Sequence, residues 1–317
     1  MTTRPAVDAD APSFDAYSLD ELTRLVNDPA AGRLLRLSAG AELAQRGDPR
    51  PGVLTLELEW CSVAAGTFTM GGSPDDVLAF DRERPQHSVP MPAFRMSRYP
   101  VTNGQWSRFV SGGGYDEPQW WMPTGWSARN TCGWTEPRFW SDTSWAGNQS
   151  NRPVVGVSWY EAIAYAKWLS SQLGYDVRVC SEAEWEKAAR GQDGRTYPCG
   201  AHLDADAVHA SSQEQDCGAA APVGCYPLSI SPWGIEDLVG NTYAWTRSRW
   251  GPAEARPGFG YPYVADDGRE GMQSDDYRVV RGGAWNFPLR NARCSYRGKD
   301  LPDDVFRNVG VRLVAGA

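Results

Sequence analysis

The C-terminal stretch 277–314 constrains the fold most, because two short β-like runs enclose a long segment with no helix or strand period. Residues 277–280 lead into the Gly282-Gly283 break, and residues 309–314 follow the irregular segment. Arginine recurs through the segment among side chains of every chemical type. Two strands that hold a long irregular loop form a scaffold on which a surface is displayed. We therefore expect this stretch to form a surface that binds rather than catalyses.

The composition favours a loop-rich globular chain over a long-helix protein. The 317 residues include 33 glycines, 23 prolines and 15 tryptophans, which is typical of loops and turns that aromatic side chains hold in place. An apolar fraction of 41% supports a substantial core, and the length fits one large domain or two ordinary ones. The net charge of −8 argues against nucleic acid or an anionic membrane surface as the main partner.

The cysteines predict reduced, buried thiols in a cytoplasmic protein. Seven cysteines occur with no Cys-x-x-Cys pair and no zinc-ribbon spacing. The N-terminal residues lack an apolar signal segment, and no apolar run is long enough to span a bilayer. In an oxidising compartment, pairing among Cys199, Cys217 and Cys225 would be available.

The N-terminal region predicts a polar tail and a helical hairpin, over residues 1–53, ahead of a main domain over residues 54–317. Ser18 and Glu21 form a capping-box pattern for a helix over 18–27, and a second helix is expected over 30–46. A hairpin of this size cannot hold a core alone. It either packs on the main domain or docks a partner through residues 18–46.

The middle of the chain predicts short strands and capped helices. Strands are expected over 60–70, 88–98 and 175–179, with the prolines in 88–98 favouring an edge strand, and a turn and strand over 234–245. Helices are expected over 103–110, 159–173 and 183–190. Three carboxylates stand near the start of the last helix, and we interpret them as complements to its dipole. They are Glu182, Glu184 and Glu186.

Residues 111–150 have no clear period but carry many tryptophans. We expect the indoles to fasten a loop to the core, because tryptophan is usually largely buried. An aromatic binding wall is the alternative. The tryptophans stand at 120, 121, 126, 134, 140 and 145. Residues 191–235 and 247–276 are expected to be further loops.

Short motifs in order along the main domain resemble the formylglycine-generating-enzyme (sulfatase-modifying factor) family. The matching segments are 66–71 (GTFTMG), 99–103 (YPVTN), 153–159 (PVVGVSW), 181–186 (SEAEWE), 234–241, 281–285 (RGGAW) and 310–312 (GVR). The resemblance implies an α+β chain with the C-type lectin-like fold of this family and little regular secondary structure.

The catalytic residues of the family are not found in this sequence. Copper-dependent members use a cysteine pair shortly after the Arg-Gly-Gly segment, whereas residues 285–290 contain no cysteine and Cys294 is alone. Iron-dependent sulfoxide synthases of the family take their histidine ligands largely from another domain, and the histidines here are His87, His202 and His209. We therefore expect no catalytic residues, no catalytic metal and no cofactor.

Calcium is the one metal that the resemblance leaves open. The family binds structural calcium near a Gly-Asn-x-Trp-Glu-Trp segment, which here reads GNTYAW over 240–245. Ala244 replaces the glutamate and removes a hard oxygen ligand. Asn241 remains as a weak calcium candidate.

The C-terminal run most resembles the variable proteins of diversity-generating retroelements, whose selected positions in this segment form a ligand-binding face. The resemblance implies scaffold positions at Arg281, Gly282, Gly283, Trp285, Arg293, Arg297, Gly310 and Arg312. The expected ligand-binding residues are Asn286, Phe287, Leu289, Ser295, Tyr296, Gly298, Lys299, Asp300, Leu301, Asp303, Val305 and Phe306.

The apolar members of this segment have two interpretations. Some are expected to pack inward as anchors of the loop, and the others to form an exposed apolar patch with a polar rim. The sequence thus predicts a non-catalytic protein that binds a protein or other macromolecular ligand through residues 286–306. The alternative is a metal-dependent oxidase of the formylglycine-generating or sulfoxide-synthase type.

Overall fold

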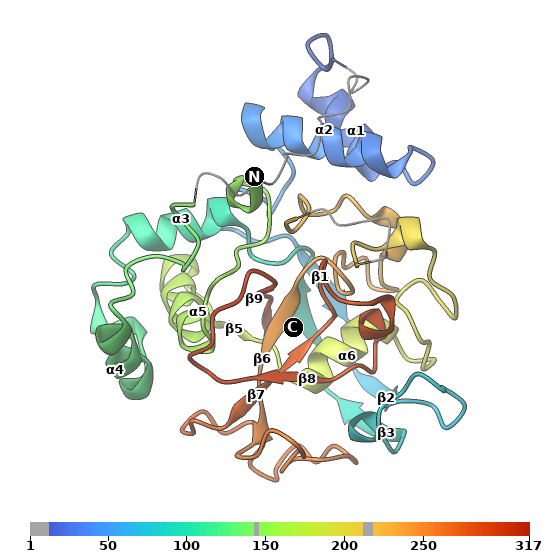
Figure 1. Ribbon diagram of the computed structural model, residues 1–317, viewed down its shortest axis with the longest axis vertical. Coiled ribbons are helices and arrows are strands. Elements are labelled where there is room, and N and C mark those ends of the chain that lie inside the picture. Colours follow the sequence, from blue (N-terminus) through green and yellow to red (C-terminus); the bar gives the residue numbers. More distant parts are fainter. Residues whose placement is uncertain (1–12, 143–145, 212–217) are drawn as a thin grey trace, which may run out of the picture.

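The computed structural model describes residues 13–142, 146–211 and 218–317 (Figure 1). Helices and short strands alternate with long loops, as the glycine and proline content indicates. The α-helices are α1 (Leu19–Asn27), α2 (Arg33–Arg46), α3 (Asn103–Ser111), α4 (Pro123–Cys132), α5 (Trp159–Leu173) and α6 (Glu182–Arg190).

In the part of the chain that is described, the strands form two four-stranded sheets and one two-stranded sheet. The first sheet has the order β1-β4-β10-β5, the second β8-β7-β6-β9, and the third pairs β2 with β3. The strands are β1 (Trp60–Val63), β2 (Gly66–Met70), β3 (His87–Met91), β4 (Phe94–Ser97), β5 (Val177–Val179), β6 (Tyr243–Gly251), β7 (Tyr277–Arg281), β8 (Gly298–Asp300), β9 (Val309–Val311) and β10 (Leu313–Gly316).

The C-terminal stretch joins the two larger sheets. β7 and β8 pair antiparallel, β9 runs parallel to β6, and β10 pairs with β4 and β5 in the other sheet. Arg312 lies between β9 and β10, is 1% exposed, and donates Nη1 to the carbonyl oxygen of Ser97 at 2.7 Å. The end of the chain therefore fixes one sheet against the other.

Capping boxes begin four of the helices and confirm the helix starts predicted from sequence. In each box the cap hydroxyl accepts a backbone N–H while the third helical side chain accepts the cap N–H. The pairs are Ser18 with Glu21, Thr102 with Gln105, Ser158 with Glu161, and Ser181 with Glu184.

Two strand predictions were wrong in their extent. Residues 60–70 form two strands in different sheets, because the chain leaves the first sheet at residues 64–65. Residues 88–98 divide in the same way around Pro92. The second half is β4, which lies between β1 and β10 rather than at an edge.

The structure also contains α4, which the sequence pattern did not predict. Pro123 occupies its first turn and Gly133 ends it in the left-handed conformation. One face of α4 carries small polar side chains, so the helix lacks the apolar period on which the prediction relied.

The largest core cluster surrounds α5 and is strongly aromatic. Trp106 stacks on Tyr165 with ring centroids 4.5 Å apart, and Trp121 is buried beside them. The tryptophans at 120, 126, 134 and 140 are partly buried against this cluster, so the indoles fasten the loop as predicted. Residue 145 lies outside the described part of the chain.

The N-terminal hairpin packs on the main domain (Figure 1). Leu22 and Leu43 are fully buried in a cluster with Cys225 and Tyr226. Arg36 is 1% exposed and donates Nε to the carbonyl oxygen of Cys225 at 2.9 Å. The packing alternative is therefore confirmed, whereas docking of a partner by this hairpin stays a prediction. None of the helices in the described residues is both long and apolar enough to cross a bilayer.

Candidate active site

A cavity of about 290 Å³ opens beside the second sheet and the C-terminal stretch. We call it the central cavity. It is lined by Arg82, Tyr243, Val280, Phe287, Tyr296, Gly298, Lys299, Asp300, Phe306, Asn308 and Val309. The strands β6, β7, β8 and β9 each contribute to the wall, so residues far apart in sequence meet there.

Aromatic rings form much of the wall. The ring of Tyr243 lies edge-on to Phe287, with centroids 5.3 Å apart, and 6.1 Å from the ring of Tyr296. Asn291 donates Nδ2 to the hydroxyl oxygen of Tyr243 at 2.8 Å. Burial raises the pKa of Tyr243, so its phenol stays protonated at neutral pH.

Asp300 supplies a carboxyl group to the cavity wall. Burial raises its pKa to about 7, the nearby Asp304 carboxylate adds to the rise, and Lys299 opposes it. Lys299 pairs with Glu254 at 3.1 Å. Among the described residues, no hydrogen bond or ion pair engages the Asp300 side chain. Its carboxyl group is therefore available to a ligand or a proton.

Arg82 forms another part of the wall, and its guanidinium group already contacts aromatic rings and a backbone carbonyl oxygen of the protein. Its guanidinium lies 4.2 Å from the ring centroid of Phe80 and 5.4 Å from that of Tyr296. Its Nε donates to the carbonyl oxygen of Arg297 at 2.8 Å.

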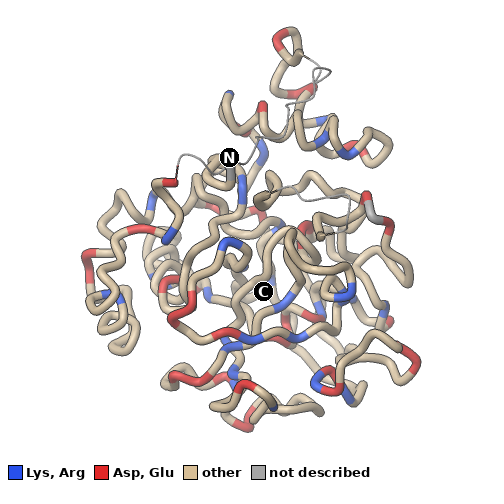
Figure 2. Tube along the Cα trace, viewed as in Figure 1, with Lys and Arg blue, Asp and Glu red and all other residues tan. Residues whose placement is uncertain are grey.

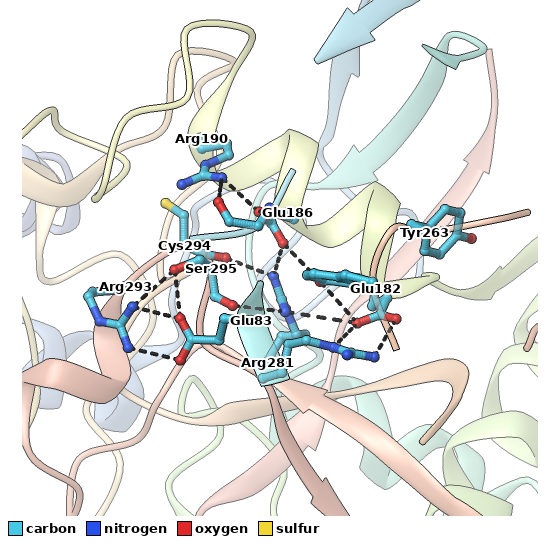
Figure 3. Close-up of polar contacts among 12 residues, drawn as sticks. Glu83, Glu182, Glu186, Arg190, Tyr263, Arg281, Arg293, Cys294 and Ser295 are labelled. Carbon is cyan, nitrogen blue, oxygen red and sulfur yellow. Dashed lines mark hydrogen bonds and ion pairs between the residues drawn. The ribbon is translucent and has the colours of Figure 1, made fainter. Parts of the chain in front are cut away.

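A buried network of ion pairs underlies the C-terminal stretch (Figure 3). Glu83 accepts two hydrogen bonds from Arg293, at 2.6 and 2.9 Å. Glu182 accepts two from Arg297, at 2.7 and 2.9 Å. All four side chains are fully buried.

Glu186 extends the network to a second strand. Its carboxylate bonds Arg281 on β7, and it accepts the Arg190 guanidinium and the Gly71 N–H at 2.9 and 2.7 Å. The interpretation of Glu182 and Glu186 as dipole complements was therefore wrong, because these side chains are buried counter-ions. Glu184 caps α6 and pairs with Arg178.

The residues assigned to the scaffold are mostly buried. Arg281, Arg293, Arg297 and Arg312 are at most 1% exposed. A Cβ at Gly283, whose φ is +74°, would lie 2.9 Å from the backbone of residue 291. A Cβ at Gly310 would lie 2.6 Å from the carbonyl oxygen of residue 154. The indole N–H of Trp285 donates to the carbonyl oxygen of residue 307 at 3.2 Å.

The structure brings only part of the predicted ligand-binding set into the central cavity. Phe287, Tyr296, Gly298, Lys299, Asp300 and Phe306 line it. Asn286, Leu289 and Val305 do not, and Leu301 and Asp303 line a different cavity. Ser295 cannot belong to a display surface, because it is 2% exposed and donates Oγ to Glu83 at 2.9 Å.

The sequence reasoning missed several cavity residues from other segments. Tyr243 lies in the predicted strand 234–245, and Asn308 lies between the predicted ligand-binding residue Phe306 and the scaffold position Gly310. Arg82 lies in a short 3-10 helix, Asp81–Glu83, in a segment that carries no motif. Val280 and Val309 belong to strands. The alternation of side chains along a strand predicts which face of the sheet each valine lies on, but it does not predict which residues of other strands lie next to it. The pairing of strands in the sheet brings these residues together, and no local sequence pattern predicts that pairing.

The histidines and cysteines of the described residues do not fit a copper or iron centre. No group of three or more His, Cys, Asp or Glu side chains in that part of the chain could hold a metal ion. His209 is buried with Nε2 against the carbonyl oxygen of Ala219 and Nδ1 against the Tyr226 hydroxyl. His87 accepts the Tyr263 N–H. Cys294 is buried, and burial raises its pKa to about 12. Cys217 lies outside the described residues.

The calcium candidate Asn241 is held by the protein backbone. Its Oδ1 accepts the N–H of Ala221 at 2.8 Å, and its Nδ2 donates to the carbonyl oxygen of the same residue at 3.3 Å. A side chain used in this way has little capacity left for a cation.

Curated relatives of this chain are enzymes. Hercynine oxygenase of Mycolicibacterium smegmatis is 34% identical over 304 residues, which cover 90% of this chain and 68% of that protein. Hercynine oxygenase of Mycobacterium tuberculosis is 37% identical, over 78% of this chain and 58% of that protein. Formylglycine-generating enzyme of Mus musculus is 27% identical, over 84% of this chain and 77% of that protein.

Two solved structures show the same fold. PvdO from Pseudomonas aeruginosa has a TM-score of 0.61 and 23% identity, over 84% of this chain and 99% of that chain. Treponema denticola variable protein 1 has a TM-score of 0.59 and 20% identity, over 84% and 97%. The predicted α+β, C-type lectin-like fold of the formylglycine-generating-enzyme type is therefore confirmed.

These findings overturn the functional prediction. The expectation of a non-catalytic, retroelement-type binding protein was wrong, because the relatives at 34–37% identity are hercynine oxygenases and those at 27% include a formylglycine-generating enzyme. The variable protein shares the fold at 20% identity, and a shared fold at this identity does not indicate a shared activity. The expectation that no cofactor is needed also conflicts with similarity to such enzymes.

The match to a family model covers most of the chain. The sulfatase-modifying factor enzyme 1-like domain matches residues 51–317, which include every strand of the three sheets and every residue that lines the central cavity. The chain belongs to the sulfatase-modifying factor enzyme 1-like (formylglycine-generating-enzyme) family.

Proposed function

We propose that this chain is an enzyme domain of the oxidase or oxygenase type and that its substrate binds in the central cavity. The observation that carries the site assignment is the carboxyl group of Asp300, which lies in the cavity wall with no partner among the described residues. The names of the similar relatives support the reaction class.

The lining favours a small substrate that carries both an ammonium group and a carboxylate. The aromatic rings of Tyr243, Phe287 and Phe306 would attract a cation through their π faces, and Asp300 would supply the opposite charge. Lys299 lies on the same wall and offers a cation to the carboxylate. Hercynine stands in the names of these relatives, so it is the first compound to test.

The described residues would bind and orient such a substrate. Asn291 donates to the Tyr243 hydroxyl oxygen, which leaves the Tyr243 proton free to point toward Tyr296 or the substrate. The aromatic wall would exclude water around the bound ammonium group and strengthen its attraction to Asp300. Oxidation by oxygen in this family depends on copper or iron, as the resemblance implies. The described residues do not fit such a centre.

Isothermal titration calorimetry with hercynine tests the proposal. We expect one binding site per chain, and we expect Asp300→Asn to weaken binding by about tenfold or more, because the amide keeps the shape and removes the charge. Asp266→Asn, which removes an exposed carboxylate that does not line the cavity, is the matched control and should change the affinity little. Equal affinities for the wild type and Asp300→Asn would place the substrate elsewhere.

A further inference from the structure

Arg82 lines the central cavity with a guanidinium group that the protein holds in place without neutralising it. Its Nε donates to the carbonyl oxygen of Arg297 at 2.8 Å, and its guanidinium lies 4.2 and 5.4 Å from the ring centroids of Phe80 and Tyr296. Among the described residues, its two terminal nitrogens have no hydrogen-bond or ion-pair partner. The N–H groups of both terminal nitrogens therefore remain available to a ligand.

The neighbouring cations differ from Arg82 in this respect. Arg297 bonds the buried carboxylate of Glu182 at 2.7 and 2.9 Å. Lys299, the other cation of the cavity wall, pairs with Glu254 at 3.1 Å. Figure 2 shows Lys and Arg interspersed with Asp and Glu along the described chain, so the attraction of an anion depends on local groups rather than on a field of one sign. In the cavity, Arg82 is the cation whose charge no described carboxylate balances.

A buried carboxamide shows that the same wall also lacks a hydrogen-bond donor. Asn308 is 8% exposed and lines the cavity, and its Nδ2 donates to the Oδ1 of Asn286 at 2.9 Å. Within the described part of the chain, the Oδ1 of Asn308 accepts no hydrogen bond. A polar atom in so buried a wall costs free energy unless a bound group satisfies it. The wall thus offers donors at Arg82 and acceptors at Asn308 and Asp300.

We propose that Arg82 binds the carboxylate of the substrate, with its two terminal nitrogens donating to the two carboxylate oxygens. The planar guanidinium matches a carboxylate in geometry, and such paired, charge-assisted bonds are stronger than bonds between neutral groups. The contacts to Phe80, Tyr296 and Arg297 fix the guanidinium before the ligand arrives, which reduces the entropy lost on binding. The inference rests on the proposed function, because it assigns the anionic group of a substrate whose ammonium group Asp300 attracts. Arg82 would then determine specificity for carboxylates.

Calorimetric titration of the whole chain with two matched probes tests the proposal. Both probes carry a phenyl ring on a short stem, but 3-phenylpropionate has only a carboxylate and 2-phenylethylammonium has only an ammonium group. We expect Arg82→Gln to weaken the binding of 3-phenylpropionate by about tenfold or more, and to leave 2-phenylethylammonium bound at least as tightly as before. Asp300→Asn should give the opposite pattern.

Two further variants separate the paired bonds from the charge alone. Arg82→Lys keeps the charge and loses the planar pair of donors, so it should also weaken the binding of 3-phenylpropionate, by about threefold or more. Arg108→Gln removes an exposed arginine that does not line the cavity, and it should change neither affinity appreciably. Retained binding of 2-phenylethylammonium by Arg82→Gln would show that the cavity is still folded.

The two probes also distinguish a failure of this inference from a failure of the proposed function. If 3-phenylpropionate does not bind the wild type, binds Arg82→Gln equally well, or is weakened no more than 2-phenylethylammonium, the assignment of Arg82 is wrong. If instead 2-phenylethylammonium does not bind, or binds regardless of Asp300, the ammonium site of the proposed function is wrong, while the response of 3-phenylpropionate to Arg82→Gln still decides the carboxylate site.

Discussion

Replacing Glu83 with glutamine tests whether buried ion pairs hold the C-terminal stretch in its place. Glutamine keeps the shape of the side chain and removes its charge. In the wild type, Arg293 makes two hydrogen bonds to Glu83, and the hydroxyl of Ser295 makes a third. The side chains of Glu83 and Arg293 are both fully buried. The substitution therefore leaves a buried guanidinium short of its main partner.

The structure also gives the size of the expected effect. Removing one partner of a buried ion pair costs about 3–5 kcal/mol in the free energy of unfolding. Asp76 remains 3.0 Å from Arg293, so we expect a loss near the lower end, about 3 kcal/mol. The control Glu254→Gln breaks an exposed pair with Lys299 and should cost no more than about 1 kcal/mol.

Urea denaturation of both variants measures the effect. The free energy of unfolding follows from the midpoint and the slope, and an unchanged slope shows that the comparison is valid. The double variant Glu83→Gln/Arg293→Met should lose less than the sum of the two single variants, because it leaves neither charge of the Glu83–Arg293 pair buried alone, and only the partly exposed Asp76 loses a partner. If Glu83→Gln costs no more than Glu254→Gln, the network does not hold the stretch, and our account of the scaffold fails.

Three further outcomes are expected. Burial raises the pKa of Glu161 to about 7, above its usual 4.5, so its folded form binds a proton more tightly and stability falls as pH rises from about 4.5 to 7. Glu161→Gln should flatten that fall in thermal unfolding scans, and an identical pH profile would contradict it. Gly283→Ala should cost about 1–3 kcal/mol because of its positive φ and close backbone contact, whereas Gly260→Ala, with open space around it, should cost little; equal losses in urea would refute this. Adding EDTA should leave the melting temperature unchanged, because Asn241 is held by Ala221; a marked drop would establish a calcium site.

Helix starts were predictable from sequence because their signals are local. Ser158 and Glu161 lie three residues apart, and the box that they form needs no other part of the chain. Strand limits were less predictable. Residues 60–70 look like one strand, yet the two halves pair with different partners, and only the folded chain decides which sheet each half joins.

The buried glutamates show why charge patterns mislead. Glu182 and Glu186 stand in the first turns of a helix, where a solvated carboxylate is the usual interpretation. Their partners Arg281 and Arg297 lie about a hundred residues further along the chain, at separations of 95 and 115 positions. The sequence alone does not predict which arginine pairs with which glutamate over such a separation.

The candidate site was predictable in its location and not in its chemistry. The segment 286–306 contributes Phe287 and Asp300 to the central cavity. The lack of a cysteine pair does not imply a lack of catalysis, because a missing metal motif gives no information about the carboxyl group and the phenols of the wall. Tyr243 reaches the same cavity from β6, and only the sheet pairing brings it there.

The affinity for hercynine as a function of pH tests the central claim most directly. Asp300 has a pKa of about 7 and must be charged to attract an ammonium group, so affinity should rise as pH increases through 7. We expect calorimetry to show binding about tenfold or more weaker at pH 5.5 than at pH 8.5, since one pH unit below the pKa is worth up to tenfold. Asp300→Asn should bind weakly throughout, and any pH dependence that it keeps belongs to the ligand. Binding to the wild type that follows the same pH profile as Asp300→Asn would contradict the assignment of the central cavity as the substrate site.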